Sequence, residues 1–312
     1  MINGILNINK PEGITSAKAV SKIKKKLQFK KAGHTGTLDP FATGILLVCL
    51  NRATKITQYL SVLDKEYIGI MVLGVTTDTQ DLKGRVLKIK NVNHQALNIE
   101  NLEEVFASFQ GRLWQKPPMF SALRHKGLRL YSLARKGIEI DLDPRKIFIK
   151  QISILKIKVD YFPSITFKVK CSKGTYIRTL CNDIGQKLGC GAFLSRLERT
   201  EIGNHNIQQS IDLDKFLRMP LQEQYKNILS IDKALNNFNK IILLKDKEIE
   251  DRVKNGGPFS EKEISEIINE ESNNKFNDRF RVSSYDGNLL AIGKKVEDFD
   301  YTKKYRVEKV FS

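Results

Sequence analysis

The apolar positions of the chain alternate in some stretches and recur at helical spacing in others, which predicts a mixed α/β protein. Alternating or continuous apolar residues predict strands at 5–8, 45–50, 66–75, 147–160 and 165–171. Helical spacing predicts helices at 16–29, 99–109 and about 176–188. The first helix carries Val20, Ile23 and Leu27 on its apolar face, and Thr15 or Ser16 can cap it.

The pattern changes near residues 236–239, after which the chain becomes rich in strands. It predicts a strand at 241–244, a helix at 246–254 and a last strand at 305–311. Between them, residues 279–285 and 289–294 flank an Asp286-Gly287 turn, which is typical of a hairpin. An acidic stretch at 261–274 does not fit the compact strand-rich segment that the rest of this part of the chain predicts. We therefore predict two domains, residues 1–235 and 236–312, the second one small.

One loop combines dense turn chemistry with the start of a buried strand: residues 33–50 read GHTGTLDPFATGILLVCL. Pro40 restricts the backbone of Asp39 to extended geometry, which gives its carboxylate a defined direction. The loop thus presents Asp39 beside His34 at the rim of a sheet. Two interpretations stay open from this stretch alone: a carboxylate placed for chemistry, or an Asx-type turn that only caps local backbone.

A second notable stretch is residues 170–188, KCSKGTYIRTLCNDIGQKL, in which a strand ends at a glycine and a helix follows. Tyr176 and Arg178 fall in the first turn of that helix. An arginine there opposes the helix dipole, so it favours a carboxylate or phosphate partner. The alternative is a surface arginine without a partner.

The charge is strongly basic, with 53 Lys and Arg against 35 Asp and Glu and a net charge of +18. Between Glu104 and Glu139 there is no acidic residue, whereas this segment holds Arg112, Lys116, Arg124, Lys126, Arg129, Arg135 and Lys136. This uneven distribution favours a polyanionic partner such as nucleic acid over a mere compositional bias. Adjacent Pro117 and Pro118, followed by Phe120, predict that residues 112–137 form an exposed arm, with a short helix at 132–136.

Several function classes lack support in the sequence. The four cysteines and four histidines show no CxxC or HxxxH spacing, which argues against a structural zinc and favours buried free thiols. No phosphate-binding loop of the Walker type is present. The N-terminus does not resemble a signal peptide, and no apolar run reaches the length of a membrane helix. We expect a soluble cytoplasmic protein.

Four motifs together resemble the TruB family, the bacterial tRNA pseudouridine-55 synthases. They are NGILNINKPEGITS, GHTGTLDPFATGILLVCLNRATK, CSKGTYIRTL and LGCGAFLSRLERT, in this order between residue 3 and about residue 232. The tail sequence FRVSSYDGNLLAIGKK is similar to a PUA RNA-binding module. The resemblance implies a pseudouridine synthase catalytic domain with a central mixed, mainly antiparallel sheet flanked by helices and loops, followed by a small β-rich PUA-like domain.

The resemblance also implies the reaction: isomerisation of one uridine to pseudouridine in the T stem-loop of tRNA. Because product and substrate share one formula, no cofactor or metal is expected, and we expect a monomer that needs no protein partner. Asp39 matches the family's catalytic aspartate, and Arg178 matches the arginine that pairs with it. An ionised carboxylate can act as a nucleophile, and a nearby cation favours that ionised form.

Further residues match the family's substrate pocket. Tyr67 matches a tyrosine that stacks on the target base and is a candidate for removing the C5 proton, and His34 matches a histidine beside the flipped nucleotide. Tyr176 and Leu197 match residues that line the uracil pocket, and Asp81 matches an acid of open role. The arm matches an insertion that grips the T arm. The expected RNA contacts are Lys10 (also a structural buttress), Lys116, Arg124, Lys126 and Arg129.

Two other functions remain in competition. A tRNA-folding chaperone would use the basic arm and the C-terminal module without chemistry. A guide-RNA-dependent synthase of the dyskerin type shares the aspartate loop but needs a guide and partner proteins.

Overall fold

The computed structural model describes residues 2–92, 97–121, 123–125, 127–134, 136–138, 140–269, 278–297 and 303–311. Of the residues predicted from sequence to contact RNA, Lys126 lies outside these ranges, as does Arg135 of the arm. Within the described ranges, no helix is long and apolar enough to cross a membrane.

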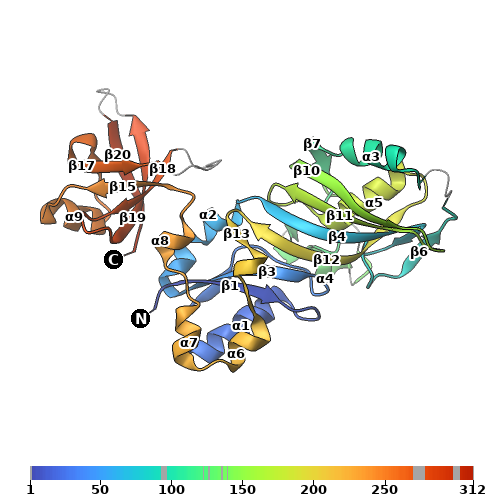
Figure 1. Cartoon of the computed structure of the whole chain (residues 1–312), viewed down its shortest axis with the longest axis horizontal. Coiled ribbons are helices and arrows are strands. Elements are labelled where there is room, and N and C mark those ends of the chain that lie inside the picture. The colour runs from blue at the N-terminus through green and yellow to red at the C-terminus, as the bar shows by residue number, and fades with distance from the viewer. Residues whose placement is uncertain are drawn as a thin grey trace.

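A ten-stranded sheet forms the centre of the molecule (Figure 1). Its main path runs β14-β1-β3-β12-β4-β11-β10-β7, with β2 paired to β3 and β13 paired to β12. Only the pairs β1–β14 and β3–β12 are parallel, so the predicted mixed, mainly antiparallel sheet is confirmed. The strands are β1 Gly4–Lys10, β2 Ala32–His34, β3 Thr43–Leu50, β4 Lys65–Leu73, β7 Gly111–Gln115, β10 Arg145–Lys158, β11 Ser164–Cys171, β12 Ala192–Ile202, β13 His205–Asn206 and β14 Ile211–Asp212.

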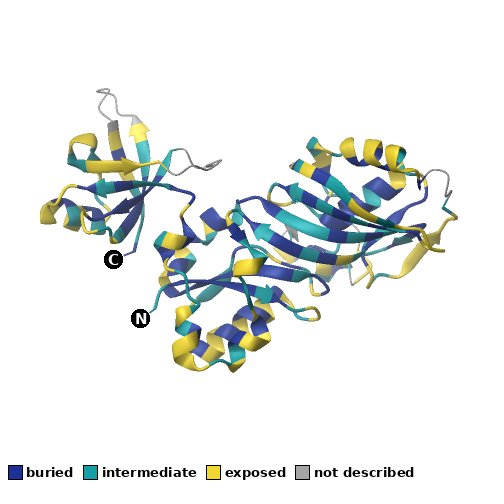
Figure 2. Cartoon of the chain, in the orientation of Figure 1, coloured by how far each residue is buried: buried dark blue, intermediate teal, exposed yellow. Residues whose placement is uncertain are grey.

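Helices cover this sheet where its strands present apolar side chains. Helix α1 (Ser16–Leu27) begins at Thr15, whose hydroxyl accepts a hydrogen bond from the Lys18 amide, as predicted for a helix cap. It packs with α6 on β1 and β3, while α3 (Ile99–Ala107) and α5 (Ile177–Lys187) pack on β4, β10 and β11. Figure 2 shows the exposed residues of α1, α6 and α7 on their outer sides. The shorter helices are η1 Asn51–Ile56, α2 Thr57–Ser61, α4 Leu130–Ala134, η3 Ile207–Gln209, α6 Leu213–Arg218, α7 Leu221–Lys226 and α8 Ile231–Ala234.

A second sheet of six strands follows, in the order β16-β20-β19-β18-β15-β17. The predicted hairpin is confirmed, because β18 and β19 pair antiparallel. Part of the acidic stretch forms β17, which pairs with β15, whereas residues 270–277 lie outside the described ranges. The elements are β15 Asn239–Leu243, α9 Lys247–Lys254, β16 Phe259–Ser260, η4 Glu261–Glu263, β17 Ile264–Ile268, β18 Arg279–Ser283, β19 Leu289–Glu297 and β20 Lys303–Val310.

Two short hairpins project from the central sheet: β5 (Val75–Thr77) with β6 (Val86–Ile89), and β8 (Arg124–His125) with β9 (Leu128–Arg129). The second lies in the predicted arm. The prediction that this arm is exposed from its first prolines is wrong, because Pro117 and Pro118 are buried. The base of the arm is held against α5 by hydrogen bonds of Gln115 and of the Phe120 carbonyl, which draws the prolines into the body.

Candidate active site

The loop that carries Asp39 is held from both ends. The Ser16 hydroxyl, at the start of α1, donates to the Leu38 carbonyl at 3.1 Å and accepts from the Leu38 amide at 2.8 Å. On the other side of Asp39, the Pro40 carbonyl accepts from the Gly13 amide at 2.8 Å. These contacts fix the backbone on both sides of Asp39, so its carboxylate has a defined position.

Lys10 adds a further tie to this loop from β1. Its ammonium donates to the carbonyls of Pro11 at 2.7 Å, Ile14 at 3.0 Å and Pro40 at 3.5 Å. The residue has no exposed surface, and burial lowers the pKa of Lys10 to about 8, although Asp39 acts in the opposite direction. Lys10 thus ties the N-terminal segment to the Asp39 loop, and its enclosed side chain presents no surface for the predicted contact with RNA.

Arg178 and Asp39 form the ion pair that the sequence predicts. The Nε atom of Arg178 lies 2.9 Å from Oδ2 of Asp39, and its Nη2 lies 3.5 Å from Oδ1. The arginine side chain is 4% exposed, whereas that of Asp39 is 34% exposed. The carboxylate is therefore the member of the pair that a bound molecule can reach.

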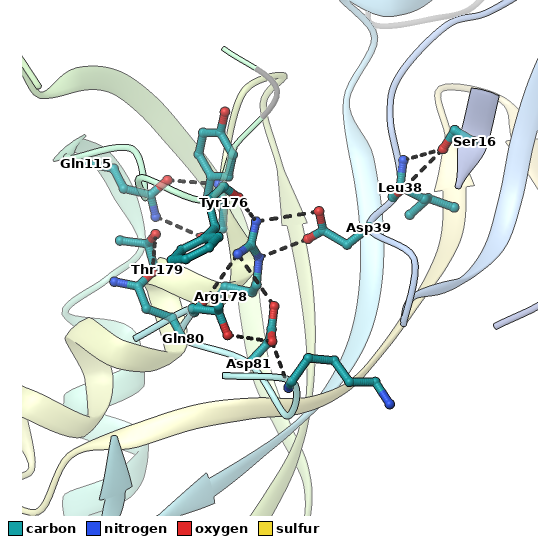
Figure 3. A network of polar contacts seen from close by, with 12 residues as sticks. Ser16, Leu38, Asp39, Gln80, Asp81, Gln115, Tyr176, Arg178 and Thr179 are labelled. Atoms are coloured by element: carbon teal, nitrogen blue, oxygen red, sulfur yellow. Dashed lines mark hydrogen bonds and ion pairs between the residues drawn. The ribbon is translucent and has the colours of Figure 1, made fainter. Parts of the chain in front are cut away.

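The remaining donors of Arg178 are also used (Figure 3). Nη1 donates to the Thr79 carbonyl at 2.9 Å and lies 3.5 Å from Asp81, while Nη2 donates to the Phe120 carbonyl at 2.8 Å. Asp81 is itself held by the Thr79 hydroxyl at 2.7 Å and the Lys83 amide at 2.9 Å. Asp81, whose role the sequence leaves open, thus helps to hold the arginine between two carboxylates.

The electrostatic state of Asp39 results from opposing effects. Burial raises the pKa of Asp39 above its ordinary value, and the Arg178 guanidinium lowers it, as predicted for a cation at this distance. The Asp81 carboxylate raises the pKa again, and Lys10 lowers it. The cation therefore limits a rise in pKa that burial would otherwise make larger.

Two glutamines, neither of them singled out by the sequence, hold the first turn of α5. The side chain of Gln115, at the end of β7, donates to the Tyr176 carbonyl at 3.0 Å and accepts from the Tyr176 amide at 2.8 Å. Gln80 accepts from the Thr179 hydroxyl at 2.8 Å. The backbone of Gln80 is left-handed, with φ of 61°, a strained conformation for a residue with a side chain.

Arg199 is a buried cation that sequence reasoning missed. It is 1% exposed, and it donates to the carbonyls of Ile45 at 2.9 Å and Gly36 at 3.1 Å, which binds β12 to the Asp39 loop. At Gly44, where φ is +101°, a Cβ atom would lie 2.2 Å from the Arg199 carbonyl oxygen. A glycine is therefore required beside it. Strand β12 reads AFLSRLERTEI, and its other charged residues and two register shifts leave no regular apolar alternation in which Arg199 stands out.

The predicted pocket residues gather around these cations. Tyr67 faces Arg199 in the register of β4 and β12, and burial raises the pKa of Tyr67, which Arg199 partly opposes. Burial likewise raises the pKa of Tyr176, and the charge of Asp39 reaches both tyrosines. Burial, with Arg199, lowers the pKa of the half-buried His34. Leu197 is buried in the same apolar cluster as Leu38, and Tyr67 packs against this cluster.

The predicted RNA contacts of the arm have different surroundings. Lys116 is exposed and forms an ion pair with Asp141, so it is not an unpaired cation. Arg124 and Arg129 are opposite each other in the backbone register of the β8–β9 hairpin. Among the described residues, no group of three or more His, Cys, Asp or Glu side chains is arranged to hold a metal ion.

Two family models match the chain: the TruB family pseudouridylate synthase N-terminal domain at residues 24–177, and the tRNA pseudouridylate synthase B C-terminal domain at 178–240. A tRNA pseudouridine synthase B of Clostridium acetobutylicum is 42% identical over 95% of this chain and 97% of its own. One from Clostridium perfringens strain 13 is 40% identical over 99% of both chains, and one from Clostridium kluyveri is 47% identical over 78% of this chain and 81% of its own.

Solved structures show the same architecture over nearly the whole chain. A chain of an H/ACA RNP bound to a substrate RNA containing 2'-deoxyuridine superposes with a TM-score of 0.74 at 26% identity, covering 99% of this chain and 85% of that one. A chain of a Cbf5-Nop10-Gar1 complex superposes with a TM-score of 0.73 at 27% identity, with the same coverage.

Proposed function

The chain belongs to the TruB family of pseudouridylate synthases and makes pseudouridine in tRNA, and we propose that its target is uridine 55 in the T loop. The position of the target rests on the resemblance of the Asp39 loop and of the start of α5 to those of pseudouridine-55 synthases. The observation that carries the proposal is the partly exposed carboxylate of Asp39, held by a buried arginine beside Tyr67 and Tyr176.

In the proposed reaction the enzyme extrudes the target uridine from the T loop. Extrusion costs a few kcal/mol, and stacking on Tyr67 at about 1–3 kcal/mol per base offsets much of this. Asp39 acts as the nucleophile toward the nucleotide, and the C1′–N1 glycosidic bond breaks. The uracil rotates, a C1′–C5 bond forms, the bond between Asp39 and the nucleotide breaks, C5 loses its proton and N1 gains one. Substrate and product are therefore isomers.

Each residue of the pocket has one proposed role. Arg178 keeps Asp39 ionised and oriented, and Tyr176 and Leu197 enclose the uracil. Tyr67 stacks on the base and receives the C5 proton as its phenolate, the form that the neighbouring Arg199 favours against the effect of burial. His34 stacks beside the extruded nucleotide. The part of the arm that follows β7, residues 116–137, grips the T stem through phosphate contacts, and residues 236–312 form a second RNA-binding domain. We propose that the protein acts in the cytoplasm as a monomer, without cofactor or partner protein.

A guide-dependent reaction is the second candidate, because the superposed structures include an H/ACA RNP and a Cbf5 complex. The experiment that separates the two uses the purified chain alone with a T-arm minihelix and maps pseudouridine in the product. We expect complete conversion at the position of uridine 55 and none when this nucleotide is cytidine. No conversion by the chain alone would overturn the proposal.

The role of Asp39 is tested in the same assay. Asp39→Asn is expected to abolish release of tritium from C5-labelled uridine while tRNA binding persists, because the amide is not a nucleophile at this site. Asp160→Asn is the matched control, since this carboxylate lies in an exposed turn and pairs only with Lys158 in the described structure. If Asp39→Asn retains turnover near the level of the control, the mechanism is wrong. Remodelling of tRNA by the inactive variant would reveal an additional chaperone activity.

A further inference from the structure

The sheet carries a patch of aromatic and basic side chains that the proposed reaction does not use. This patch consists of Arg112 and Trp114 on β7 and of Lys146 and Phe148 on β10. The register pairs Trp114 with Lys146 and Arg112 with Phe148, so the four residues form a compact square on two adjacent strands. Trp114, the only tryptophan of the chain, is 66% exposed, and Phe148 is 40% exposed.

The four side chains lie on the face of the sheet opposite to the core. The residues that alternate with them, Leu113 and Ile147, belong to or pack against the apolar cluster beneath α3 and α5. Because successive side chains of a strand point to opposite faces, the patch points away from those helices. A single exposed apolar residue is ordinary, but two aromatic rings interleaved with two cations on neighbouring strands form a coherent surface.

The cations of the patch are available for a ligand. Nζ of Lys146 lies 5.1 Å from the centroid of the Trp114 ring, a cation–π contact that leaves the ammonium exposed to solvent. Neither Lys146 nor Arg112 forms an ion pair with a residue in the described ranges, whereas the nearby Lys116 and Lys150 pair with Asp141 and Asp64. The patch thus combines stacking surface with positive charge that no neighbouring carboxylate neutralises.

The patch adjoins the candidate active site through the strand that it occupies. Strand β7 is the last strand of the large sheet (Figure 1). Trp114 is followed by Gln115, which is buried and holds the backbone of Tyr176. Strand β7 therefore carries Trp114 on its outer face and, on its inner face, Gln115, which holds the backbone of a pocket residue. A molecule that extends from the pocket around this edge meets the patch.

We propose that the Arg112–Trp114–Lys146–Phe148 patch is a second RNA-binding surface, which stacks an unpaired nucleotide of the substrate RNA outside the T stem-loop. Aromatic residues on an open sheet, flanked by cations, suit the π-face of a base and its phosphate together. An acidic protein surface would satisfy the two cations but would leave the exposed indole without a stacking partner. The inference rests on the proposed function only in taking tRNA as the ligand.

The single tryptophan allows a direct test on the whole protein. Tryptophan fluorescence is recorded while full-length tRNA, a T-arm minihelix or oligouridylate is added. We expect saturable quenching by full-length tRNA and by oligouridylate. Trp114→Ala is expected to weaken binding of full-length tRNA about 5-fold to 150-fold, the range that loss of one stacked base predicts. The variant should raise KM for tRNA, leave kcat unchanged and convert the minihelix as the wild type does.

Two further variants separate stacking from a general surface effect. Trp114→Phe retains an aromatic platform and should recover most of the affinity. Tyr161→Ala removes an aromatic residue that is 86% exposed elsewhere and should change nothing. The proposal is overturned if tRNA is converted without any change in fluorescence, if Trp114→Ala binds tRNA like the wild type, or if the minihelix loses as much affinity as tRNA. Failure of the proposed function is distinguishable, because the wild type would then convert neither RNA.

Discussion

At the residue scale, Arg178 is expected to set the pH range in which Asp39 works. The carboxylate must be ionised, so activity rises as pH rises through the pKa of Asp39. Burial raises this pKa and Arg178 opposes the rise. Arg178→Gln should therefore move the acidic limb of kcat/KM to higher pH and lower the rate near neutrality on the order of 100-fold, the size typical for loss of one electrostatic partner.

The matched variant is Arg178→Lys, which retains the positive charge but cannot form the two-point contact. It should keep the acidic limb close to that of the wild type while it lowers kcat, because orientation is lost and charge is not. Profiles of kcat/KM against pH for the three proteins measure both effects. An acidic limb that stays unchanged in Arg178→Gln would contradict the assignment of the cation to Asp39.

The pairing of Asp39 with Arg178 follows from the resemblance to the TruB family and is present in the structure. The local patterns alone, a turn-rich loop and a helix start, mark the two residues and indicate only that Arg178 favours an anionic partner. Gln80 and Gln115 could not be found in this way. Their partners are a hydroxyl on α5 and the backbone of Tyr176, and a backbone group leaves no mark in the sequence. The burial of Lys10 also escapes prediction, because its partners are carbonyls that only the folded loop brings together.

At the element scale, Gln115 is expected to join β7 to α5. Gln115→Leu leaves the Tyr176 amide without its partner and removes one of the two donors to the Tyr176 carbonyl, which still accepts from the Leu180 amide. The loss should destabilise the protein by about 1–3 kcal/mol. It should also lower kcat/KM, since Tyr176 lines the proposed pocket. Urea denaturation and steady-state kinetics measure the two effects. Gln151→Leu, at an exposed position of β10, is the control. Equal urea midpoints for the two variants would contradict the role of Gln115 in holding Tyr176.

The regular elements could be predicted largely from periodicity, because the strands β1, β3, β4, β10 and β11 and the helices α1 and α3 bury one face against the core. The arm could not. Its prolines and bases are typical of exposed chain, yet Pro117 and Pro118 are buried because Arg178 and Tyr176 hold the residues that flank them. Tertiary contacts that start from α5 override the local composition.

At the scale of the whole molecule, the C-terminal sheet and the central sheet share one apolar cluster. Ile292 and Phe311 pack in the same cluster as Ile5, Tyr59 and Phe238. Hydrogen bonds reinforce this contact: Arg52 donates to the Phe311 carbonyl at 2.8 Å, Lys55 to the Val310 carbonyl at 2.8 Å, and the Tyr59 hydroxyl to Glu308 at 3.0 Å. A sheet joined by buried apolar contacts cannot separate without exposing them to water.

We therefore expect the two sheets to unfold together. Scanning calorimetry should show one transition whose calorimetric and van't Hoff enthalpies agree. Phe311→Ala removes a side chain that is only 9% exposed, and it should lower the Tm of that single transition through a loss of about 3–5 kcal/mol. Tyr285→Ala, at a residue that is 51% exposed in the turn between β18 and β19, should leave Tm nearly unchanged. Two separate transitions in the wild type would show that the shared cluster does not couple the sheets, and Phe311→Ala would then shift only one of them.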